Sequence, residues 1–269
     1  MYVDVADSLA LVYGNMEVFV LVMVRIMGFF VIMPFFSGTT TPVRSRLAFA
    51  FVTSLLIVVS GHVALDAVVA GIMDYFLIIV SEFVTGFLIG FVVFLFFSIF
   101  HMMGQVTDFQ IGFAMVSMHD PISQVQSPIT GNLYYFAFLS IFVASGGLSI
   151  MLLYVMQTFV MIPPGSAFIL GNDGLAATFV GMLSIYFELG LRFAMPIISV
   201  IIIVDATLGI LIKAVPQMNV FVVGLPIKVG IGLLTIRLLV PFWESVMYDI
   251  FMDRMSDSFS GIIGRLTGQ

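Results

Sequence analysis

Isolated charges inside long apolar stretches are the residues of this sequence that could do chemistry. Glu82, Gly86 and Gly90 recur every fourth residue, so a helix would place them on one face. A charge within a bilayer costs about 2.5–3.5 kcal/mol on insertion scales unless it is paired or hydrated. Two interpretations stay open: Glu82 lines a path for protons or ions, or it lies near the water boundary of a packing face. In the second, the glycines let another backbone approach.

Two further charged groups follow the same logic. Glu188 and Arg192 are four residues apart, and Pro196 continues their face. An ion pair at this spacing lowers the cost of both charges, which predicts a structural pair, with a proton relay as the alternative. Arg25 lies in the first apolar stretch, two turns after Glu17. A lone Arg in a span usually faces protein, so Arg25 pairs with Glu17 or with a carboxylate of another subunit.

Signatures of catalysis are missing from the sequence. There is no HExxH, GxGxxG, Walker A or Ser-His-Asp arrangement. The three histidines are far apart without ligand spacing, and there is no cysteine. We therefore expect a protein that is not an enzyme and that uses no cofactor and no metal.

The composition indicates a membrane protein. Of 269 residues, 61% are hydrophobic and only 9% are charged, whereas soluble domains carry about 25% charged residues. The nine Lys and Arg residues form no basic stripe, which argues against nucleic-acid binding. Such a chain is built for the lipid bilayer or for a large buried assembly.

Six apolar stretches predict an all-α integral membrane protein, because about 20 apolar residues suffice for one helical crossing. As one helix at 1.5 Å per residue, the fifth would be about 57 Å long, with Pro196 as the expected break. We expect residues 1–269 to form one membrane domain, with a polar, amphipathic tail at 249–269 that lies in water. The six stretches are Val18–Phe36, Leu47–Ser60, Tyr75–Phe100, Leu133–Met161, Leu175–Ile212 and Val220–Tyr248.

The sixth stretch is preceded and interrupted by residues that disfavour a smooth helix. The segment PQMNVFVVGLPIKVGIG, Pro216–Gly232, contains two prolines and three glycines. A broken helix survives in a membrane only where protein or water satisfies the freed backbone groups. The segment is therefore either the substrate site of a small-molecule transporter, at the midplane of the membrane, or a bent segment that packs inside a larger assembly.

The stretch GQVTDFQIGFAMVSMHDP, Gly104–Pro121, mixes polar and bulky apolar residues between two apolar runs. Phe109 and Phe113 are spaced to share one helical face, and the flexible side chains of Met115 and Met118 follow. Glycine and the Asp-Pro turn supply hinges at Gly104, Gly112 and Asp120-Pro121. The residue types fit a rearranging apolar seal and a buried connector equally well.

Several motifs, in order, carry a resemblance over essentially the full chain. The most specific are QIGF at 110–113 with Asp120-Pro121, followed by PQMNVFVVGLPIK at 216–228. Supporting landmarks are Arg25, Pro34, PVRSR at 42–46, Glu82-Gly86-Gly90, Gly104-Gln105, Gly146-Gly147, Pro163-Pro164-Gly165 and Pro196. With these residues the chain resembles the FliR family of flagellar type III export-gate subunits. One departure is Leu148, where members commonly carry histidine after the two glycines.

The resemblance implies a subunit built of helical hairpins, partly lifted out of the bilayer plane. Such subunits assemble with several copies of FliP and FliQ into a helical gate in the bacterial inner membrane, at the flagellar basal body. FlhB and FlhA are implied as further partners, and unfolded flagellar export substrates pass through. The resemblance further implies a subunit that contacts the lipid bilayer and binds no nucleic acid.

The resemblance also implies residue roles. The stretch 104–121 resembles a loop that plugs the closed pore, which favours the seal over the connector. The implied gating residues are Phe109, Gln110, Gly112, Phe113, Met115, Met118, Asp120 and Pro121. The implied intramembrane polar and assembly residues are Arg25, Glu82, Gly86, Gly90, Glu188, Arg192, Pro216, Gln217, Asn219 and Lys228.

Three alternatives stay open. The first is the equivalent subunit of a virulence-type injection system, which shares these motifs. The second is a secondary transporter of a small solute, with Glu82 or the Glu188–Arg192 pair as its coupling site. The third is a purely structural scaffold, in which substitutions in the loop would change neither ion leak nor secretion.

Overall fold

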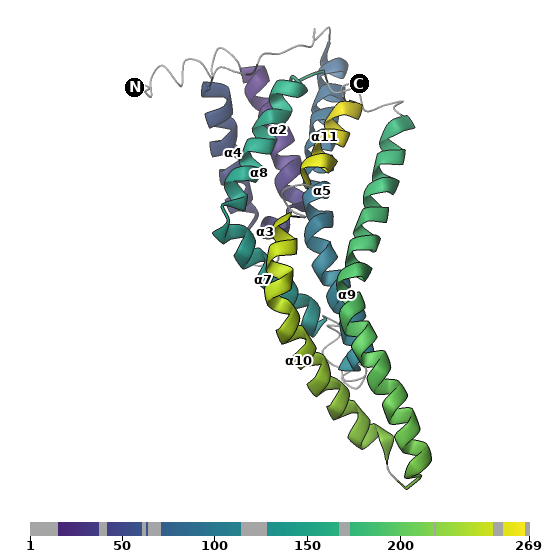
Figure 1. The fold of residues 1–269 in the computed structure, drawn as a ribbon. Coiled ribbons are helices and arrows are strands. Elements are labelled where there is room, and N and C mark those ends of the chain that lie inside the picture. The colour runs from purple at the N-terminus through teal and green to yellow at the C-terminus, as the bar shows by residue number, and fades with distance from the viewer. Residues whose placement is uncertain are drawn as a thin grey trace. The chain divides into compact units, whose positions relative to one another are not determined.

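The regular structure of the chain is helical. A computed structural model describes residues 16–37, 42–60, 63, 71–113, 128–166, 173–217, 219–249 and 255–266, and these residues contain no strand. The helices in this part of the chain are α2 (Met16–Ile32), α3 (Pro34–Ser37), α4 (Val43–Val59), α5 (Ile72–Ile111), α7 (Ile129–Ala144), α8 (Gly147–Met161), α9 (Asp173–Ala214), α10 (Val220–Asp249) and α11 (Met255–Leu266) (Figure 1).

Four of the six predicted apolar stretches are single helices. The first, Val18–Phe36, is divided into α2 and α3 with a break at Met33. The fourth is divided as well. The stretch predicted as Leu133–Met161 is divided into α7 and α8, with the break at Ser145 and Gly146. Gly146 has a φ of 76°, a left-handed conformation that side chains with a Cβ rarely adopt. The paired glycines 146 and 147 therefore end one helix and start the next.

Three of the helices are long and apolar enough to cross a membrane. They cover Ile72–Ile111, Phe179–Ala214 and Val222–Phe242, and the broken pair α7–α8 would make a fourth span. The predicted fold class, an all-α membrane protein, is thereby confirmed. However, α2 and α4 have 17 residues each, somewhat less than the roughly 20 that one crossing needs. The described helices thus provide fewer full-length spans than the six apolar stretches predicted.

The predicted helix breaks at proline are wrong. Helix α9 runs through Pro196, and α10 runs through Pro226 and Pro241. A proline removes one N–H donor and crowds the carbonyl four residues earlier, which kinks or breaks many helices. In apolar helices, neighbouring groups compensate for a single lost hydrogen bond, and the rest of the ladder continues. The fifth stretch is therefore one helix of 42 residues.

Contacts within the chain fall into two compact units. The first comprises residues 1–95, 146–182 and 254–269, and the second comprises 96–145 and 183–253. Helices α5 and α9 each contribute one part to the first unit and another part to the second.

In the first unit, α2 packs against both α4 and the N-terminal part of α5 (Figure 1). Glycines make the close approach to α5 possible. A Cβ added at Gly86 would fall on the backbone carbonyl of Arg25, and one at Gly90 would lie 2.7 Å from the carbonyl oxygen of Phe29. On α2, a Cβ added at Gly28 would fall on the carbonyl oxygen of Phe83 in α5. The predicted role of Gly86 and Gly90, backbone approach, is confirmed.

The C-terminal helix α11 also belongs to the first unit and packs against α8. The ring of Phe259 stacks on that of Tyr154 with 4.9 Å between their centroids. Met255 and Phe259 are buried, while Asp257 is exposed. Over residues 255–266, the described helix of the predicted tail, the buried side chains Met255 and Phe259 therefore lie against protein and not in water.

In the second unit, α5 and α7 pack through aromatic side chains. The ring of Phe138 lies 4.9 Å from that of Phe97 and stacks on that of Phe100 at 4.1 Å. One turn further along α5, a Cβ added at Gly104 would fall on the backbone of Gly131. Gly104 was predicted as a hinge. It lies instead within α5, where its missing side chain lets the two helices touch.

Candidate functional site

A buried ion pair joins α2 to α5. The Nε atom of Arg25 donates to one carboxylate oxygen of Glu82 at 2.5 Å, and Nη2 donates to the other at 2.9 Å. The Arg25 side chain is 1% exposed and the Glu82 side chain is fully buried. A guanidinium and a carboxylate that meet through two hydrogen bonds form a strong pair with a fixed geometry. The two charges therefore hold α2 and α5 in one register.

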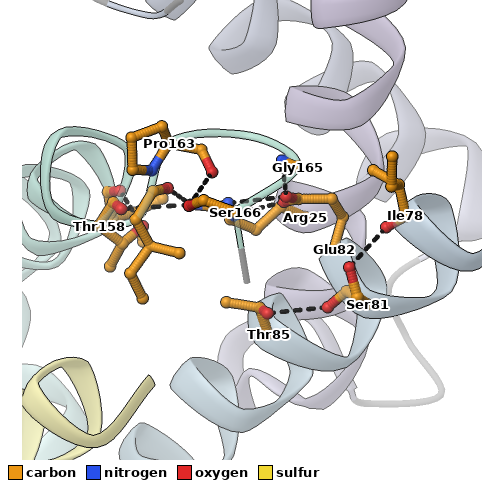
Figure 2. A network of polar contacts seen from close by, with 11 residues as sticks. Arg25, Ile78, Ser81, Glu82, Thr85, Thr158, Pro163, Gly165 and Ser166 are labelled. Carbon is orange, nitrogen blue, oxygen red and sulfur yellow. Dashed lines mark hydrogen bonds and ion pairs between the residues drawn. The ribbon is translucent and has the colours of Figure 1, made fainter. Parts of the chain in front are cut away.

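The same pair also binds the segment that follows α8. Nη1 of Arg25 donates to the backbone carbonyls of Thr158 at 3.2 Å and Ile162 at 2.8 Å. The N–H of Gly165 donates to Glu82 at 2.8 Å (Figure 2). Gly165 has a φ of 89°, so the turn that presents this N–H favours glycine. The carboxylate and guanidinium thus fasten α2, α5 and the end of α8 together.

These contacts correct the predicted partner of Arg25. Its carboxylate is Glu82 of the same chain, not Glu17 or another subunit. The Glu82 side chain is also shielded from solvent by protein, because it is fully buried and both of its oxygens accept hydrogen bonds. Phe159 adds a ring 4.5 Å from the guanidinium carbon of Arg25. This arrangement is that of a structural ion pair with satisfied partners.

The predicted ion pair between Glu188 and Arg192 is wrong. Within the described residues, Glu188 and Arg192 form no ion pair, and both are exposed on α9. Their spacing permits the contact, but the two side chains do not meet. Both charges lie inside the apolar segment Phe179–Ala214.

Lys228 pairs across the hairpin of α9 and α10. Its amine contacts the carboxylate of Asp205 on α9, with the two side chains 25% and 42% exposed. Both residues belong to the second unit. The ion pair fixes α10 beside α9 and confirms a helical hairpin in this part of the chain.

Only the start of the segment expected to break the sixth helix lies before it, whereas Pro226 and the three glycines lie inside α10. Pro216 and Gln217 form the turn between α9 and α10, and Asn219 precedes the first residue of α10. The carbonyl of Asn219 accepts from the N–H groups of Val222 and Val223, both at 3.2 Å. All three residues are exposed. Pro216, Gln217 and Asn219 therefore belong to the connection between two helices, and α10 continues unbroken through the rest of the segment.

The predicted plug stretch starts as helix. Helix α5 continues to Ile111, and Gly112 ends it with a φ of 97°. Phe109 is 75% exposed, whereas Gln110 and Phe113 are half-buried. Because the helix ends between them, Phe109 and Phe113 do not share a helical face as their spacing predicted. Met115, Met118, Asp120 and Pro121 lie outside the described residues.

Asp108 accepts from a backbone N–H, as its residue type allows, but the sequence did not indicate which backbone group it meets. Its carboxylate oxygens accept from the backbone N–H of Thr130 at 3.1 and 3.2 Å, at the N-terminus of α7. Asp108 is 5% exposed and Thr130 is 3% exposed. The residues are 22 positions apart, and nothing in their spacing indicates that they meet.

Comparison with known proteins adds to this geometry. Residues 16–254 match the family model of bacterial export proteins, family 1. The chain belongs to this family. It is 29% identical over 217 residues to the flagellar biosynthetic protein FliR of Bacillus subtilis, covering 80% of this chain and 82% of that protein. It is 28% identical over 231 residues to FliR of Aquifex aeolicus, covering 85% and 87%.

A relative with another name covers less of the chain. The secretion system apparatus protein SsaT of Salmonella typhimurium is 26% identical over 165 residues, which is 61% of this chain and 63% of SsaT. Among the described residues, no group of three or more His, Asp or Glu side chains lies close enough to hold a metal ion.

Proposed function

We propose that this protein is a subunit of the flagellar type III protein export gate. The observation that carries the proposal is the extent of its similarity to proteins named flagellar biosynthetic protein FliR, which covers 80% or more of both chains. The three long apolar helices agree with a position in a membrane. We place the protein in the bacterial inner membrane, at the flagellar basal body, without enzymatic activity of its own.

The proposed partners are several copies of FliP and FliQ, with FlhB and FlhA as further partners. Support comes from charges on the exposed face of α9. Glu188 and Arg192 are exposed within an apolar helix, and a charge that faces lipid there is costly. Partner helices that cover this face would remove both charges from lipid. The exposed apolar side chains Phe187, Leu191 and Met195 would be buried with them.

The proposed mechanism is gating by the stretch 109–121. Its described residues support this role, because α5 ends at Gly112 and directs a largely exposed Phe109 away from a buried helix face. A closed pore needs apolar bulk that excludes ions and that rearranges when a substrate enters. Phenylalanine provides the bulk and methionine the adaptability. In this proposal, unfolded flagellar proteins displace the stretch as they enter the channel.

Affinity purification of the tagged chain from membranes tests the assignment. We expect it to recover two small, multi-copy helical proteins, and we expect deletion of the chain to stop export of flagellar hook and filament proteins. A chain that purifies alone and transports a small solute when reconstituted would instead support the transporter alternative.

The similarity to SsaT favours one second candidate, the equivalent subunit of an injection system. It is the weaker candidate, because the match covers a smaller share of both chains than the FliR matches do. Complementation separates the two. The chain should restore flagellar hook export in a strain that lacks its own FliR, and it should not restore secretion through an injection system.

A further inference from the structure

We propose that Asp108 is a positioning residue that sets the direction in which the gating stretch leaves α5. It does so by clamping the last turn of α5 to the first turn of α7. The proposal rests on the proposed gating role of residues 109–121. It adds that the seal depends on a buried carboxylate outside that stretch.

The carboxylate meets α7 where a helix has free donors. Helix α7 begins at Ile129 after Pro128, and the first N–H groups of a helix have no partner within the helix. Both oxygens of Asp108 lie 3.1–3.2 Å from the N–H of Thr130. The N-cap residue of α7 is Pro128, whose side chain accepts no hydrogen bond. Asp108 of α5 therefore supplies the acceptor that the side chain of an N-cap residue usually provides.

Asp108 lies on the face of α5 that is buried over the last two turns of the helix. Gly104, Asp108 and Ile111 are at positions i, i+4 and i+7, which share one face of a helix. Gly104 touches the backbone of Gly131, and Ile111 is buried against Gly232 of α10. All of these residues belong to the second unit. The last two turns of α5 are therefore held by α7 and by α10.

The opposite face of the same two turns is exposed. Gln105 and Phe109 are four residues apart, and both are exposed. The contacts of Asp108 on one face therefore determine where Phe109 points on the other. The clamp also holds the end of α5 next to the start of α7, which are the two helix ends that residues 112–128 connect. Without the clamp, the last turn of α5 is free to unwind, as helix ends do, and Phe109 loses its fixed direction.

Ion conductance of the purified gate complex in lipid bilayers tests the proposal. We expect Asp108→Ala to raise the conductance of the closed gate about fivefold to tenfold, the population shift that corresponds to one lost helix cap. Asp108→Asn should conduct nearly as little as the wild type, because an amide oxygen accepts the same hydrogen bond. Gln105→Ala, on the exposed face of the same turns, is the matched control and should change nothing.

A combination of variants separates positioning from general damage. In a gate that already carries Phe109→Ala and Phe113→Ala, Asp108→Ala should add no further conductance, and hook protein export should continue in each variant. Additive conductance, or an assembled Asp108→Ala gate as tight as the wild type, would overturn the proposal. If the Asp108→Ala gate fails to assemble, the proposal is also overturned, because the contact would then serve assembly. This holds whether or not the Asp108→Asn gate assembles.

The proposed function can fail separately. If the Phe109→Ala and Phe113→Ala gate is as tight as the wild type, the gating role itself is wrong. If that gate leaks and the Asp108→Ala gate does not, only the positioning role of Asp108 is wrong.

Discussion

At the scale of the residue, the central feature of the first unit is the pair Arg25–Glu82. Its two charges are buried, and each is engaged by further backbone groups. Removal of one partner from such a pair leaves an uncompensated buried charge. Replacement of both partners by apolar side chains of similar volume is often nearly neutral. The pair therefore predicts strong coupling between the two positions.

We expect Glu82→Leu to destabilise the protein by about 3–5 kcal/mol, because the guanidinium of Arg25 loses its counter-charge. The double variant Arg25→Met with Glu82→Leu should recover most of this loss. Thermal unfolding of the purified chain in detergent measures both. A double variant no more stable than Glu82→Leu alone would show that the two charges are not coupled.

Both residues of this pair stand out in the sequence as charges within apolar stretches, but their spacing does not indicate that they meet. Spacing along a sequence reveals neighbours on one helix, and it therefore predicted Glu188–Arg192, which does not form, and a partner of Arg25 at Glu17. The true partner is 57 positions away. Asp108 was missed as a clamp for the same reason, since its acceptor role depends on the start of a helix 22 positions later.

At the scale of the element, helix packing in the first unit depends on glycines that face a neighbouring backbone. We expect Gly86→Ala to destabilise the protein by about 1–3 kcal/mol, because the new methyl group would overlap the backbone of Arg25. Gly181→Ala is the matched control, since an added Cβ there meets nothing within 4 Å. It should be neutral, or stabilising by up to about 1 kcal/mol through helix propensity. Equal effects of the two substitutions on thermal unfolding would contradict the packing role.

Hydrophobic stretches predicted the elements better than their interruptions did. Four of the six stretches are single helices, and the first and fourth are each divided into two. Apolar length was therefore a good guide to where helices form. Pro196 and Pro226 proved poor predictors of breaks, since one lost hydrogen bond is a small part of a helix of 30 to 42 residues. Glycine marked the true break at Gly146, where the backbone is left-handed. Gly104, predicted as a hinge, is a packing contact instead.

At the scale of the whole molecule, the exposed charges of the apolar helix α9 support the proposal that partner subunits cover this face. Substitution of Glu188 or Arg192 by alanine should leave the thermal stability of the isolated chain within about 0.5 kcal/mol, as for other surface positions. In the gate complex we expect weaker retention of FliP and FliQ during purification, since partner helices would lose a buried polar contact. Unchanged retention for both variants would argue that these charges meet water and not partners.

The conductance of the purified gate complex, with and without the apolar side chains of the gating stretch, tests the account most directly. Alanine at Phe109, Phe113, Met115 and Met118 should leave the complex assembled and raise its ion conductance in the absence of substrate. An intact complex that carries these substitutions and conducts no more than the wild type would contradict the account.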